Sequence, residues 1–478
     1  MTSTGSGVMG VRVGVSSDPL LGFVVSRENG WFDIMVNGGG TVSLHFQREP
    51  FKPRERRLIV PWNEIVVTDD VIMSLSGQDF PDKDISDTSV STCMDHDYEK
   101  MDPTIEADWN GNTPSSAICD SDPTLLLSDG QVLSESLSIP GTGLSLIYNS
   151  SRASGYKSIV DITMTPSVIP STLQFVHLKV SVEGILIKKV FEADSDLKYT
   201  FSWNRRNVYK QKVYKVANVI ISVGYEYSSC TDGIIWITKS TGIPGHDMAI
   251  SEIGGWNLNI HHRYNFIEGI LQKGDGINIY LNTIRPYLPS PNQDGDYEIL
   301  STDERELYIF NRHGLHIATK SLITNTFMYN FTYTVNTSFG KLTSVTLDNS
   351  HSGSGTSSNS HSGSGTSSNG HSGSGTSSNK VTFLRDHLNQ VKEIETSKGV
   401  KCRIEMSRTR MLEVFVTPDT DTGHLLLKRT VFHYNGVTGL IKSKSESLSG
   451  NTSNYDYDRN GRLIKATGPD GSDLKCQT

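Results

Sequence analysis

The stretch Tyr455-Asp456-Tyr457-Asp458-Arg459-Asn460-Gly461-Arg462-Leu463-Ile464-Lys465 decides the fold class of this chain. Aromatic and aliphatic residues alternate with polar ones on both sides of Asp458–Gly461, as in two strands that each bury one face. An Asn-Gly pair favours a tight turn, because both residues tolerate a positive φ. The stretch therefore predicts a β-hairpin, with Gly461 in a left-handed backbone conformation.

The same phrase occurs twice upstream. One copy begins at Phe331-Thr332-Tyr333 and ends at Gly340-Lys341-Leu342, and a weaker copy begins at Phe432-His433-Tyr434 and ends at Gly439-Leu440. Repeated hairpins of this kind cannot bury a hydrophobic face alone, so we expect them to stack on their neighbours. We expect their aromatic rings to pack inward rather than to form a sugar-binding platform. The residues predicted to maintain the repeat are Tyr333, Gly340, Tyr434, Gly439, Tyr455, Tyr457 and Gly461.

Composition favours an all-β protein. The 478 residues include 43 glycines against 17 prolines, and Val, Ile, Thr, Ser and Tyr are abundant, which favours strands joined by turns over helices. A net charge of -8 and a pI near 6.0 give no reason to expect nucleic acid as a partner. No motif implies a cofactor. No apolar run reaches the roughly 18 residues of a membrane helix, and Met1–Gly10 does not resemble a signal peptide.

The cysteines and the glycosylation sequons bear on the cellular compartment. Five widely spaced cysteines without a Cys-x-x-Cys pair argue against zinc, and Cys93 with Cys119 is the pair we expect to be bonded if any is. Reduced thiols remain the alternative. Four Asn-x-Ser/Thr sequons favour secretion. They begin at Asn149, Asn330, Asn336 and Asn451.

Changes in composition divide the chain into strand-rich modules and polar connections. A first small β-sandwich is predicted before a long polar loop, and a second β domain follows it. A Pro- and Asn-rich linker then leads to the hairpin repeats, which a decamer repeat interrupts. Its Ser, Gly and His composition predicts a disordered insertion. The predicted ranges are 11–75, 76–122, 123–281, 282–302 and 303–478, with the insertion at 351–379.

Several short motifs permit a chemical interpretation, and each has a simpler structural one. Asp421-Thr422-Gly423 matches the aspartic-protease triplet, but a second such triplet is missing, so we expect a turn. His261-His262, with His246 nearby, could ligate a metal. Adjacent strand residues point to opposite faces, however, and we therefore expect no shared ion.

Three further clusters are predicted to be solvated. Arg54-Glu55-Arg56-Arg57 fits a dibasic cleavage pattern, but a charged turn is the preferred interpretation. The acidic group at Asp95-His96-Asp97, with Glu99 and Asp102, lacks the glycine of a calcium loop. The histidines of the decamer repeat, which begin at His351, are expected to belong to a solvated linker.

These residues together resemble a known family. The phrase Tyr-Asp-Tyr-Asp-x-x-Gly-Arg-Leu is similar to the YD repeat of teneurins and of bacterial Rhs-type proteins, and the upstream text resembles teneurins specifically. The similar blocks cover most of the chain outside the decamer repeat. They include Phe23–Ile34 (FVVSRENGWFDI), Leu58–Val71 (LIVPWNEIVVTDDV), Ser150–Lys157 (SSRASGYK), Gly254–Gly274 (GGWNLNIHHRYNFIEGILQKG), Leu307–Ser321 (LYIFNRHGLHIATKS) and Cys402–Leu412 (CRIEMSRTRML).

The resemblance implies a domain order. Residues 11–75 would be a carboxypeptidase-regulatory-like sandwich, 123–281 a fibronectin-plug-like domain and 303–478 a partial YD-repeat barrel or shell. Residues 282–302 stand where the family places a β-propeller. The hypothesis that follows is a truncated or propeller-lacking teneurin, whose membrane helix would lie outside this chain.

The resemblance also implies a function. It predicts a non-enzymatic extracellular scaffold at the plasma membrane that binds a latrophilin-like receptor on an apposed cell, in cell-cell recognition and neuronal development. The full-length family would also form homodimers. The alternative is an Rhs-like shell around a toxin, which requires a C-terminal effector domain.

Overall fold

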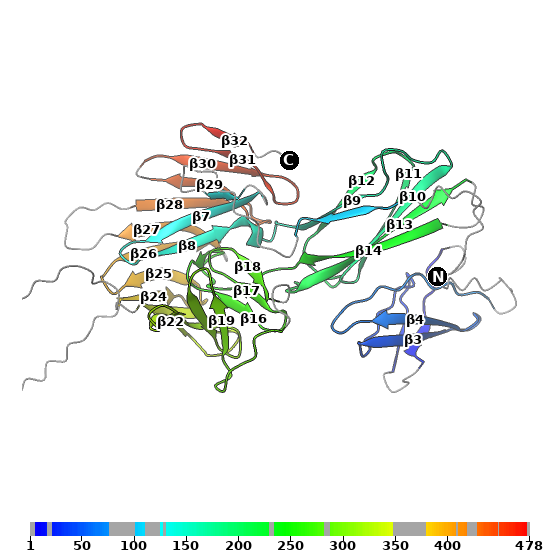
Figure 1. Ribbon diagram of the computed structural model, residues 1–478, viewed down its shortest axis with the longest axis horizontal. Helices are drawn as coiled ribbons and strands as arrows, with labels where there is room; N and C mark the ends of the chain where they lie inside the picture. Colours follow the sequence, from blue (N-terminus) through cyan, green and yellow to red (C-terminus); the bar gives the residue numbers. More distant parts are fainter. Residues whose placement is uncertain are drawn as a thin grey trace, which may run out of the picture. The chain divides into compact units, whose positions relative to one another are not determined.

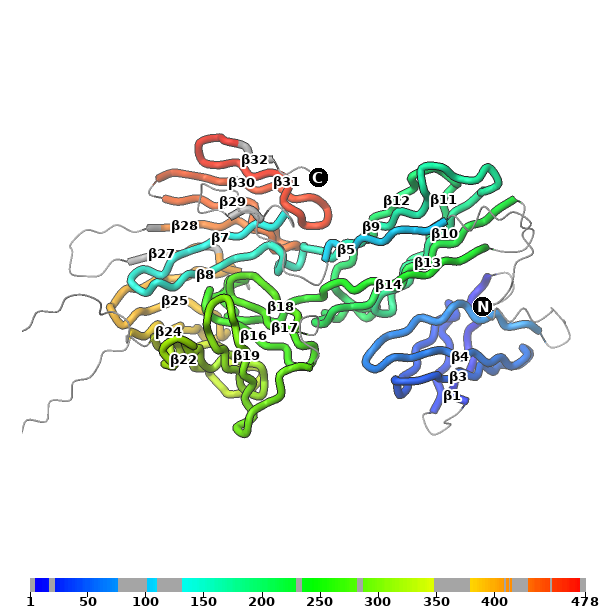
Figure 2. The backbone as a smooth tube through the Cα atoms, in the orientation of Figure 1, coloured from blue at the N-terminus to red at the C-terminus, as the bar shows by residue number. Residues whose placement is uncertain are grey.

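The computed structural model describes most of the chain in two compact units (Figures 1 and 2). One unit contains residues 1–107, 160–201 and 205–243, and the other contains 108–159, 202–204 and 244–478. The range 123–281 is thus distributed over both. The described residues are 5–16, 22–75, 101–109, 125–127, 131–228, 234–281, 287–347, 379–407, 410–417, 428–447 and 449–475.

The N-terminal module of the first unit is a four-stranded antiparallel sheet in the order β2-β1-β3-β4. Val13 and Leu44 on its inner face are 0% and 4% exposed, whereas their neighbours along each strand face outward. The predicted charged turn at Arg54–Arg57 is wrong, because these residues pair with β3 and form the first half of β4. The strands are β1 (Arg12–Val15), β2 (Phe23–Val25), β3 (Gly40–Gln47) and β4 (Arg54–Val60).

Two further sheets build the rest of the first unit, in the orders β12-β9-β5 and β11-β10-β13-β14. The hydroxyl of Tyr225, on β13, donates to the carbonyl of Met164, just after β9, at 2.6 Å. This bond joins the two sheets. Their strands are β5 (Thr104–Ala107), β9 (Ser158–Thr163), β10 (Leu173–Val182), β11 (Ile185–Glu192), β12 (Lys198–Trp203), β13 (Val216–Tyr227) and β14 (Ile234–Pro244).

A 14-stranded antiparallel sheet dominates the second unit, and its strands follow one another in sequence order from β19 to β32. Among the described strands β19 and β32 are the two edges, so the sheet is open rather than a closed barrel. The first half is β19 (Tyr297–Ser301), β20 (Glu306–Phe310), β21 (His316–Ser321), β22 (Phe327–Tyr333), β23 (Leu342–Leu347), β24 (Asn379–Arg385) and β25 (Val391–Thr396). The second half is β26 (Lys401–Ser407), β27 (Arg410–Thr417), β28 (Lys428–Tyr434), β29 (Ile441–Glu446), β30 (Thr452–Tyr457), β31 (Leu463–Thr467) and β32 (Asp473–Lys475).

Two small sheets lie beside the large one in the same unit. Figure 1 shows β7 and β8 in front of the hairpin strands, and the core between them contains Leu146, Trp256 and Phe432. A 3-10 turn at Ser150–Arg152 follows β8. The first small sheet contains β6 (Leu125–Leu127), β7 (Val132–Ile139), β8 (Leu144–Asn149) and β15 (Asn257–Leu258). The second contains β16 (Arg263–Asn265), β17 (Ile270–Gln272) and β18 (Asn278–Tyr280).

The all-β prediction is confirmed, since strands make up nearly all of the regular structure of the described residues. The decamer insertion at 351–379 lies, apart from its last residue, outside the described residues. Strand β19 falls within the range 282–302 that was predicted to be a linker, and β5 falls within the predicted polar loop.

Candidate functional site

The turn of the last complete hairpin is built by a carboxylate. Oδ1 of Asp458 accepts the backbone N–H groups of Asn460 and Arg462, both at 2.8 Å. Gly461 has a φ of +84°, the left-handed conformation predicted for it. Asn460 does not share it, so the predicted two-residue Asn-Gly turn is wrong. The Asp458 side chain stabilises a longer loop, and a register shift between Asp456 and Tyr457 accompanies it.

The same turn recurs where the sequence analysis found no repeat. Oδ1 of Asn311 accepts from the N–H groups of His313 and Leu315, and Gly314 has a φ of +72°. Oδ1 of Asp386 accepts in the same way, and Asn389 takes the left-handed position. The missed signal is Asp or Asn followed three residues later by Gly or Asn. A register shift directly precedes the second repeat position in each copy, at Phe310, Tyr333, Arg385, Tyr434 and Tyr457.

The hairpin turns are covered by irregular segments of the same unit. The N–H of Gly155 donates to Thr438 O at 2.8 Å, and the N–H of Lys157 donates to Asn460 O at 2.9 Å. Gly461 lies so close to this segment that an added Cβ would be 2.5 Å from Gly155 O. Position 461 therefore requires glycine for two reasons: a side chain would collide with Gly155, and the backbone has a positive φ.

A second segment of the same unit, which includes Gly254 and Tyr264, contacts hairpins that come earlier in the sequence. The N–H of Met411 donates to Gly254 O at 3.0 Å, and the N–H of Tyr264 donates to Gly314 O at 3.1 Å. Backbone hydrogen bonds of this kind depend on position and not on the side chain. The cover of the hairpin turns could therefore not be predicted from the residue types.

The glycines of the repeat contribute to these contacts in different ways. Gly439 has a φ of +76°, and its carbonyl accepts from the Tyr148 hydroxyl at 3.1 Å. Gly340 does not have a positive φ, but an added Cβ would collide with the carbonyl of Val335. Both glycines therefore fill places that a larger residue would disturb, for two different reasons.

The tyrosines of the repeat face the core and not solvent. Tyr434 accepts a hydrogen bond from Trp256 Nε1 at 2.9 Å, and burial raises the pKa of its hydroxyl. Tyr455, 4% exposed, donates to Glu135 on β7. The buried hydroxyl of Tyr457 has no hydrogen-bond partner among the described residues. Tyr333, Tyr434 and Tyr457 are partly buried and pack against the core that contains Tyr455.

Three buried histidines form a stack under the first hairpins. The ring centroids of His262 and His316 are 4.9 Å apart, and those of His261 and His316 are 6.2 Å apart. His261 and His262 precede β16 and do not lie on a strand, so the expectation of opposite faces does not hold. Both approach the same third ring. No group of three or more metal-ligating side chains suited to an ion occurs among the described residues.

Hydrogen bonds fix the tautomer of each ring. Nδ1 of His262 accepts the N–H of Gly274 at 3.0 Å, and Nδ1 of His316 accepts the N–H of His262 at 3.2 Å. Tyr333 donates its only hydroxyl hydrogen to His316 O at 2.7 Å, so Nε2 of His261, also 2.7 Å away, must be the donor to Tyr333. Nδ1 of His261 then accepts from Ser251. Each Nδ1 is an acceptor, and all three rings are neutral.

Burial and nearby cations maintain the neutral state. Burial, with Arg263 and Arg385 nearby, lowers the pKa of His261 to about 3. The pKa of His262 lies well below its usual value because of burial and then Lys273, and that of His316 because of burial and then His262. The stack is therefore a structural element that resists protonation, and not a general base near neutral pH.

A buried ion pair joins the second half of the large sheet to its cover. Lys444 Nζ, on β29, lies 3.0 Å from Oε2 of Glu135, whose side chain is 1% exposed. Arg462 pairs with Asp108, and its guanidinium carbon lies 3.7 Å from the centroid of the Tyr156 ring. The charges of this layer are thus satisfied internally, which favours a structural role over a catalytic one.

Family models identify the source of this architecture. Residues 1–73 match the model "Teneurin TTR-like domain", and residues 159–243 match "Teneurin 1-4, FN-plug domain". Residues 294–371 and 368–478 match "Teneurin YD-shell". The chain belongs to the teneurin family. The repeated hairpins of the large sheet are those of the teneurin YD-shell.

Curated teneurins support the assignment. Teneurin-m of Drosophila melanogaster is 51% identical over 281 residues, which cover 59% of this chain and 10% of that protein. Teneurin-3 of Danio rerio and Teneurin-4 of Homo sapiens are each 37% identical over 290 residues, covering 60% and 61% of this chain and 10% of each relative. This teneurin chain thus matches about a tenth of the length of these relatives.

A solved structure also aligns with the teneurin chain. "Crystal Structure of TcdB2-TccC3-TEV" covers 71% of this chain and 20% of that chain, at 12% identity and a TM-score of 0.23. A score this low supports no structural inference.

The predicted glycosylation asparagines occupy different environments in this teneurin. Asn149 is 7% exposed, and its Oδ1 accepts the N–H of Ser151 at 2.9 Å, so the folded chain leaves it little access to a glycan-transferring enzyme. Asn330, Asn336 and Asn451 are exposed. The proposal of glycosylation therefore rests on these three.

Other predicted sites of the teneurin chain lie outside the described residues. Cys93 and Cys119 belong to this group, as do Asp421-Thr422-Gly423 and the acidic residues from Asp95 to Glu99. Cys402 is a free, buried thiol on β26, and burial raises its pKa to about 11. Within the described part of the teneurin chain, no helix has the length and apolar character needed to cross a membrane.

Proposed function

We propose that this teneurin chain is a non-enzymatic extracellular scaffold of a cell-surface adhesion protein. It acts on the outer side of the plasma membrane, in cell-cell recognition during neuronal development. Membership of the teneurin family is the observation that carries the proposal. The Lys444–Glu135 ion pair and the hydrogen-bonded histidine stack agree with a scaffold, because each joins strands of the YD-shell to the segments that cover them.

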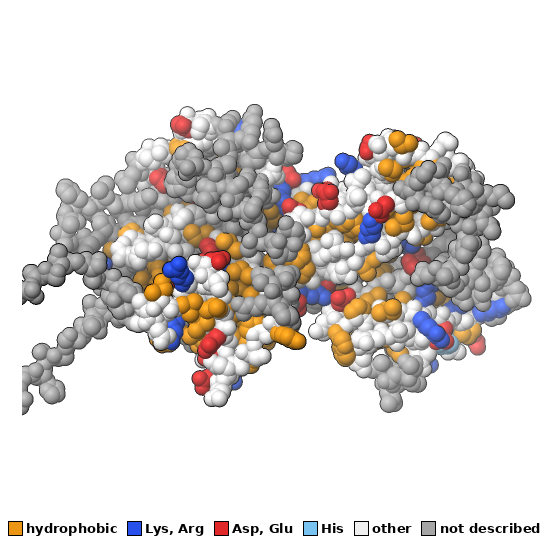
Figure 3. Space-filling model, in the orientation of Figure 1, with side chains coloured by type: hydrophobic (Ala, Val, Ile, Leu, Met, Phe, Trp, Pro, Cys, Tyr) orange, Lys and Arg blue, Asp and Glu red, His pale blue; other side chains and the backbone are white. Residues whose placement is uncertain are grey.

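The proposed partner is a latrophilin-like receptor on an apposed cell, and homodimers of the full-length protein are a second mode of association. Large apolar side chains at the hairpin turns support contact with another protein. Phe339, between β22 and β23, is 82% exposed, and Val437, between β28 and β29, is 88% exposed. On the face shown in Figure 3 the described acidic and basic side chains are interspersed. Contact through several apolar turns suits a protein partner better than a highly charged one.

Binding to cells tests the proposal. The full chain, secreted with an added signal peptide and a fluorescent tag, should bind saturably to cells that express a latrophilin-like receptor and not to parent cells. Unlabelled chain should compete. A well-folded chain that binds both cell types equally would contradict receptor binding.

Two matched variants would locate the contact. Phe339→Ser and Val437→Ser each remove an exposed apolar side chain from a turn without touching the core. If receptor binding is weaker in only one variant, the receptor contacts that turn. If binding is unchanged in both variants, the contact lies elsewhere on the chain. Purified receptor ectodomain would distinguish direct binding from capture by other surface molecules.

The alternative function, a shell around a bacterial toxin, would rest on the YD repeats alone. The TTR-like and FN-plug matches are to teneurin models. We therefore propose the adhesion function alone.

A further inference from the structure

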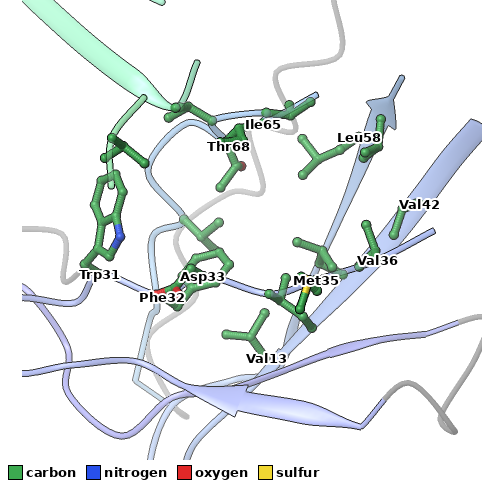
Figure 4. Close-up of a pocket in the computed structure, with 18 of the residues that line it drawn as sticks. Val13, Trp31, Phe32, Asp33, Met35, Val36, Val42, Leu58, Ile65 and Thr68 are labelled. Carbon is green, nitrogen blue, oxygen red and sulfur yellow. The ribbon is translucent and has the colours of Figure 1, made fainter. Parts of the chain in front are cut away.

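The TTR-like domain contains a cavity of about 620 Å³ (Figure 4). One wall is the inner face of the four-stranded sheet, represented by Val13, Val42 and Leu58. The other wall consists of two extended segments, residues 31–37 and 63–71, which are not strands of any described sheet, and of Gly184 with residues 207–211 of the FN-plug range in the same unit. Because these two segments do not pair into a second sheet, they leave a space between themselves and the first sheet.

The cavity is lined mainly by aliphatic and aromatic side chains. Along residues 31–37 the inward positions are Phe32, Ile34 and Val36, which alternate with exposed residues. Ile65 and Val71 line the wall from the second segment. A volume of 620 Å³ would hold about 20 water molecules at their liquid volume. Water in such a space finds few hydrogen-bond partners, so an apolar occupant is favoured.

The charges at the cavity have one sign. Asp33, Glu64, Asp69 and Asp70 contribute to the lining, whereas no Lys or Arg does. Three of these carboxylates already hold nearby cations, since Arg27 pairs with Asp33 at 2.5 Å, Arg56 with Asp69 at 3.3 Å and Lys188 with Asp70 at 3.2 Å. An anionic ligand would have to compete with these carboxylates for their cations and would also face Glu64. The lining therefore selects against fatty-acid-like anions.

We propose that this cavity binds an uncharged, largely apolar small molecule. Its volume lies within the range of small-molecule sites, which are roughly 300 to 1,000 Å³, mostly apolar and equipped with a few polar groups. Met35 and Trp62, which also line the cavity, are 93% and 72% exposed, so the cavity opens to solvent and a ligand can enter it. The site is independent of receptor binding, so either proposal can fail without the other.

A pair of dyes that differ by one sulfonate tests the charge preference. The neutral probe 1-anilinonaphthalene should bind the full chain with saturable fluorescence enhancement and raise the melting temperature of the TTR-like domain. 1-Anilinonaphthalene-8-sulfonate should bind at least tenfold more weakly. Absence of saturable binding by the neutral probe, or equal binding of both, would overturn the proposal.

Two variants from opposite walls test the location. Leu44→Trp fills the cavity from β3, and Ile34→Trp fills it from the covering segment; both should weaken binding of the neutral probe at least tenfold. His45→Trp is the control, because it adds the same side chain to the exposed face of β3. Circular dichroism establishes that each variant folds. Unchanged affinity in a folded Leu44→Trp or Ile34→Trp chain would place the probe elsewhere.

A photoprobe on the unmodified chain gives a result that does not depend on the folding of any variant. Benzophenone, which is neutral and apolar, should label peptides that contain residues 31–37, 42–44, 63–71 or 207–211 after irradiation, and 1-anilinonaphthalene should suppress the labelling. Labelling confined to other peptides would contradict the site.

Discussion

The YD-shell hairpins and the TTR-like domain are both antiparallel β structures, but their inner faces are covered differently. In the shell, Ile394 and Phe432 are 0% exposed, and backbone hydrogen bonds hold the hairpin turns against their cover. In the TTR-like domain, the inner face of β3 borders a cavity of about 620 Å³. The strands themselves alternate in the same way in both regions, so the cover and not the sheet makes the difference.

This difference in packing predicts how the stability of each region responds to acidification and to substitutions. The shell is closely packed. A change in the charge of its buried histidines or in the size of Gly461 should therefore reduce its stability. The TTR-like domain has space at its centre, and its only histidine, His45, is exposed. We therefore expect the shell to be the sensitive region and the TTR-like domain the tolerant one.

Acidification should give the largest contrast. The pKa values of His261, His262 and His316 are lowered in the folded chain, so the unfolded chain binds more protons below pH 6.5. Stability is complete above that pH and falls as the pH decreases. Each histidine that stays neutral at pH 5 costs about 2 kcal/mol, or about 6 kcal/mol for the three. The protection of β20 and β21 amides against hydrogen exchange, corrected for the intrinsic exchange rate at each pH, should fall between pH 7 and pH 5. The protection of β3 should not.

Single-residue changes would assign this effect. His262→Gln should reduce the proton uptake on unfolding by about one, and His433→Gln, at an exposed position of β28, is the control. An equal loss of protection in β3 and β20 would contradict the proposed contrast between the two regions.

Gly461→Val should be the most disruptive single substitution among those compared. Valine at a φ of +84° is strained, and its side chain would start 2.5 Å from Gly155 O and 2.8 Å from Tyr156 Cα. Strain and overpacking together should cost about 4 kcal/mol in urea-induced unfolding of the shell.

The TTR-like domain offers a matched control. Gly22 has a φ of +76°, but an added Cβ would meet nothing within 4 Å. Gly22→Val should therefore show only the backbone cost, about 1 to 2 kcal/mol. If Gly461→Val and Gly22→Val lower the free energy of unfolding by the same amount, the close fit of Gly461 against Gly155 contributes nothing to stability.

Local chemistry explains what the sequence could predict of this molecule. The alternation around Tyr457 predicts a hairpin, and Gly461 has the positive φ expected of it, because both depend on neighbouring residues. The loop length was wrong since the Asp458 carboxylate, rather than the Asn-Gly pair, determines the turn. The copy at Asn311–Leu315 was missed because its signal is the combination of an aromatic spacing, Tyr308 and Phe310, with an Asn-x-x-Gly turn.

Long-range contacts explain the rest. The histidine stack joins His261 and His262 to His316, and neither their spacing nor their types indicates that they meet. The cavity likewise depends on how the segments 31–37 and 63–71 lie over β3, although each segment has an ordinary strand-like alternation. Such features follow from tertiary packing and require the structure.

Removal of the buried carboxylate at Glu135 should come next in size. Glu135→Ala leaves Lys444, 16% exposed, without its buried partner and removes the acceptor of the Tyr455 hydroxyl. Breaking a buried pair in this way should cost about 3 kcal/mol. Glu413→Ala is the control, because the Arg429–Glu413 pair lies at the surface and should be worth less than about 1 kcal/mol. Similar losses in both variants would show that burial adds nothing to the Glu135 contact.

The smallest expected effect concerns two tyrosines of the repeat. The buried hydroxyl of Tyr457 has no hydrogen-bond partner among the described residues, so Tyr457→Phe should leave the stability unchanged or raise it by up to about 1 kcal/mol. Tyr434→Phe removes the acceptor for Trp256 Nε1 and should cost about 1 to 2 kcal/mol. Equilibrium unfolding of both variants measures the difference. A loss in Tyr457→Phe as large as that in Tyr434→Phe would mean that the Tyr457 hydroxyl is bonded in solution, and the shell would then be fully satisfied at this position too.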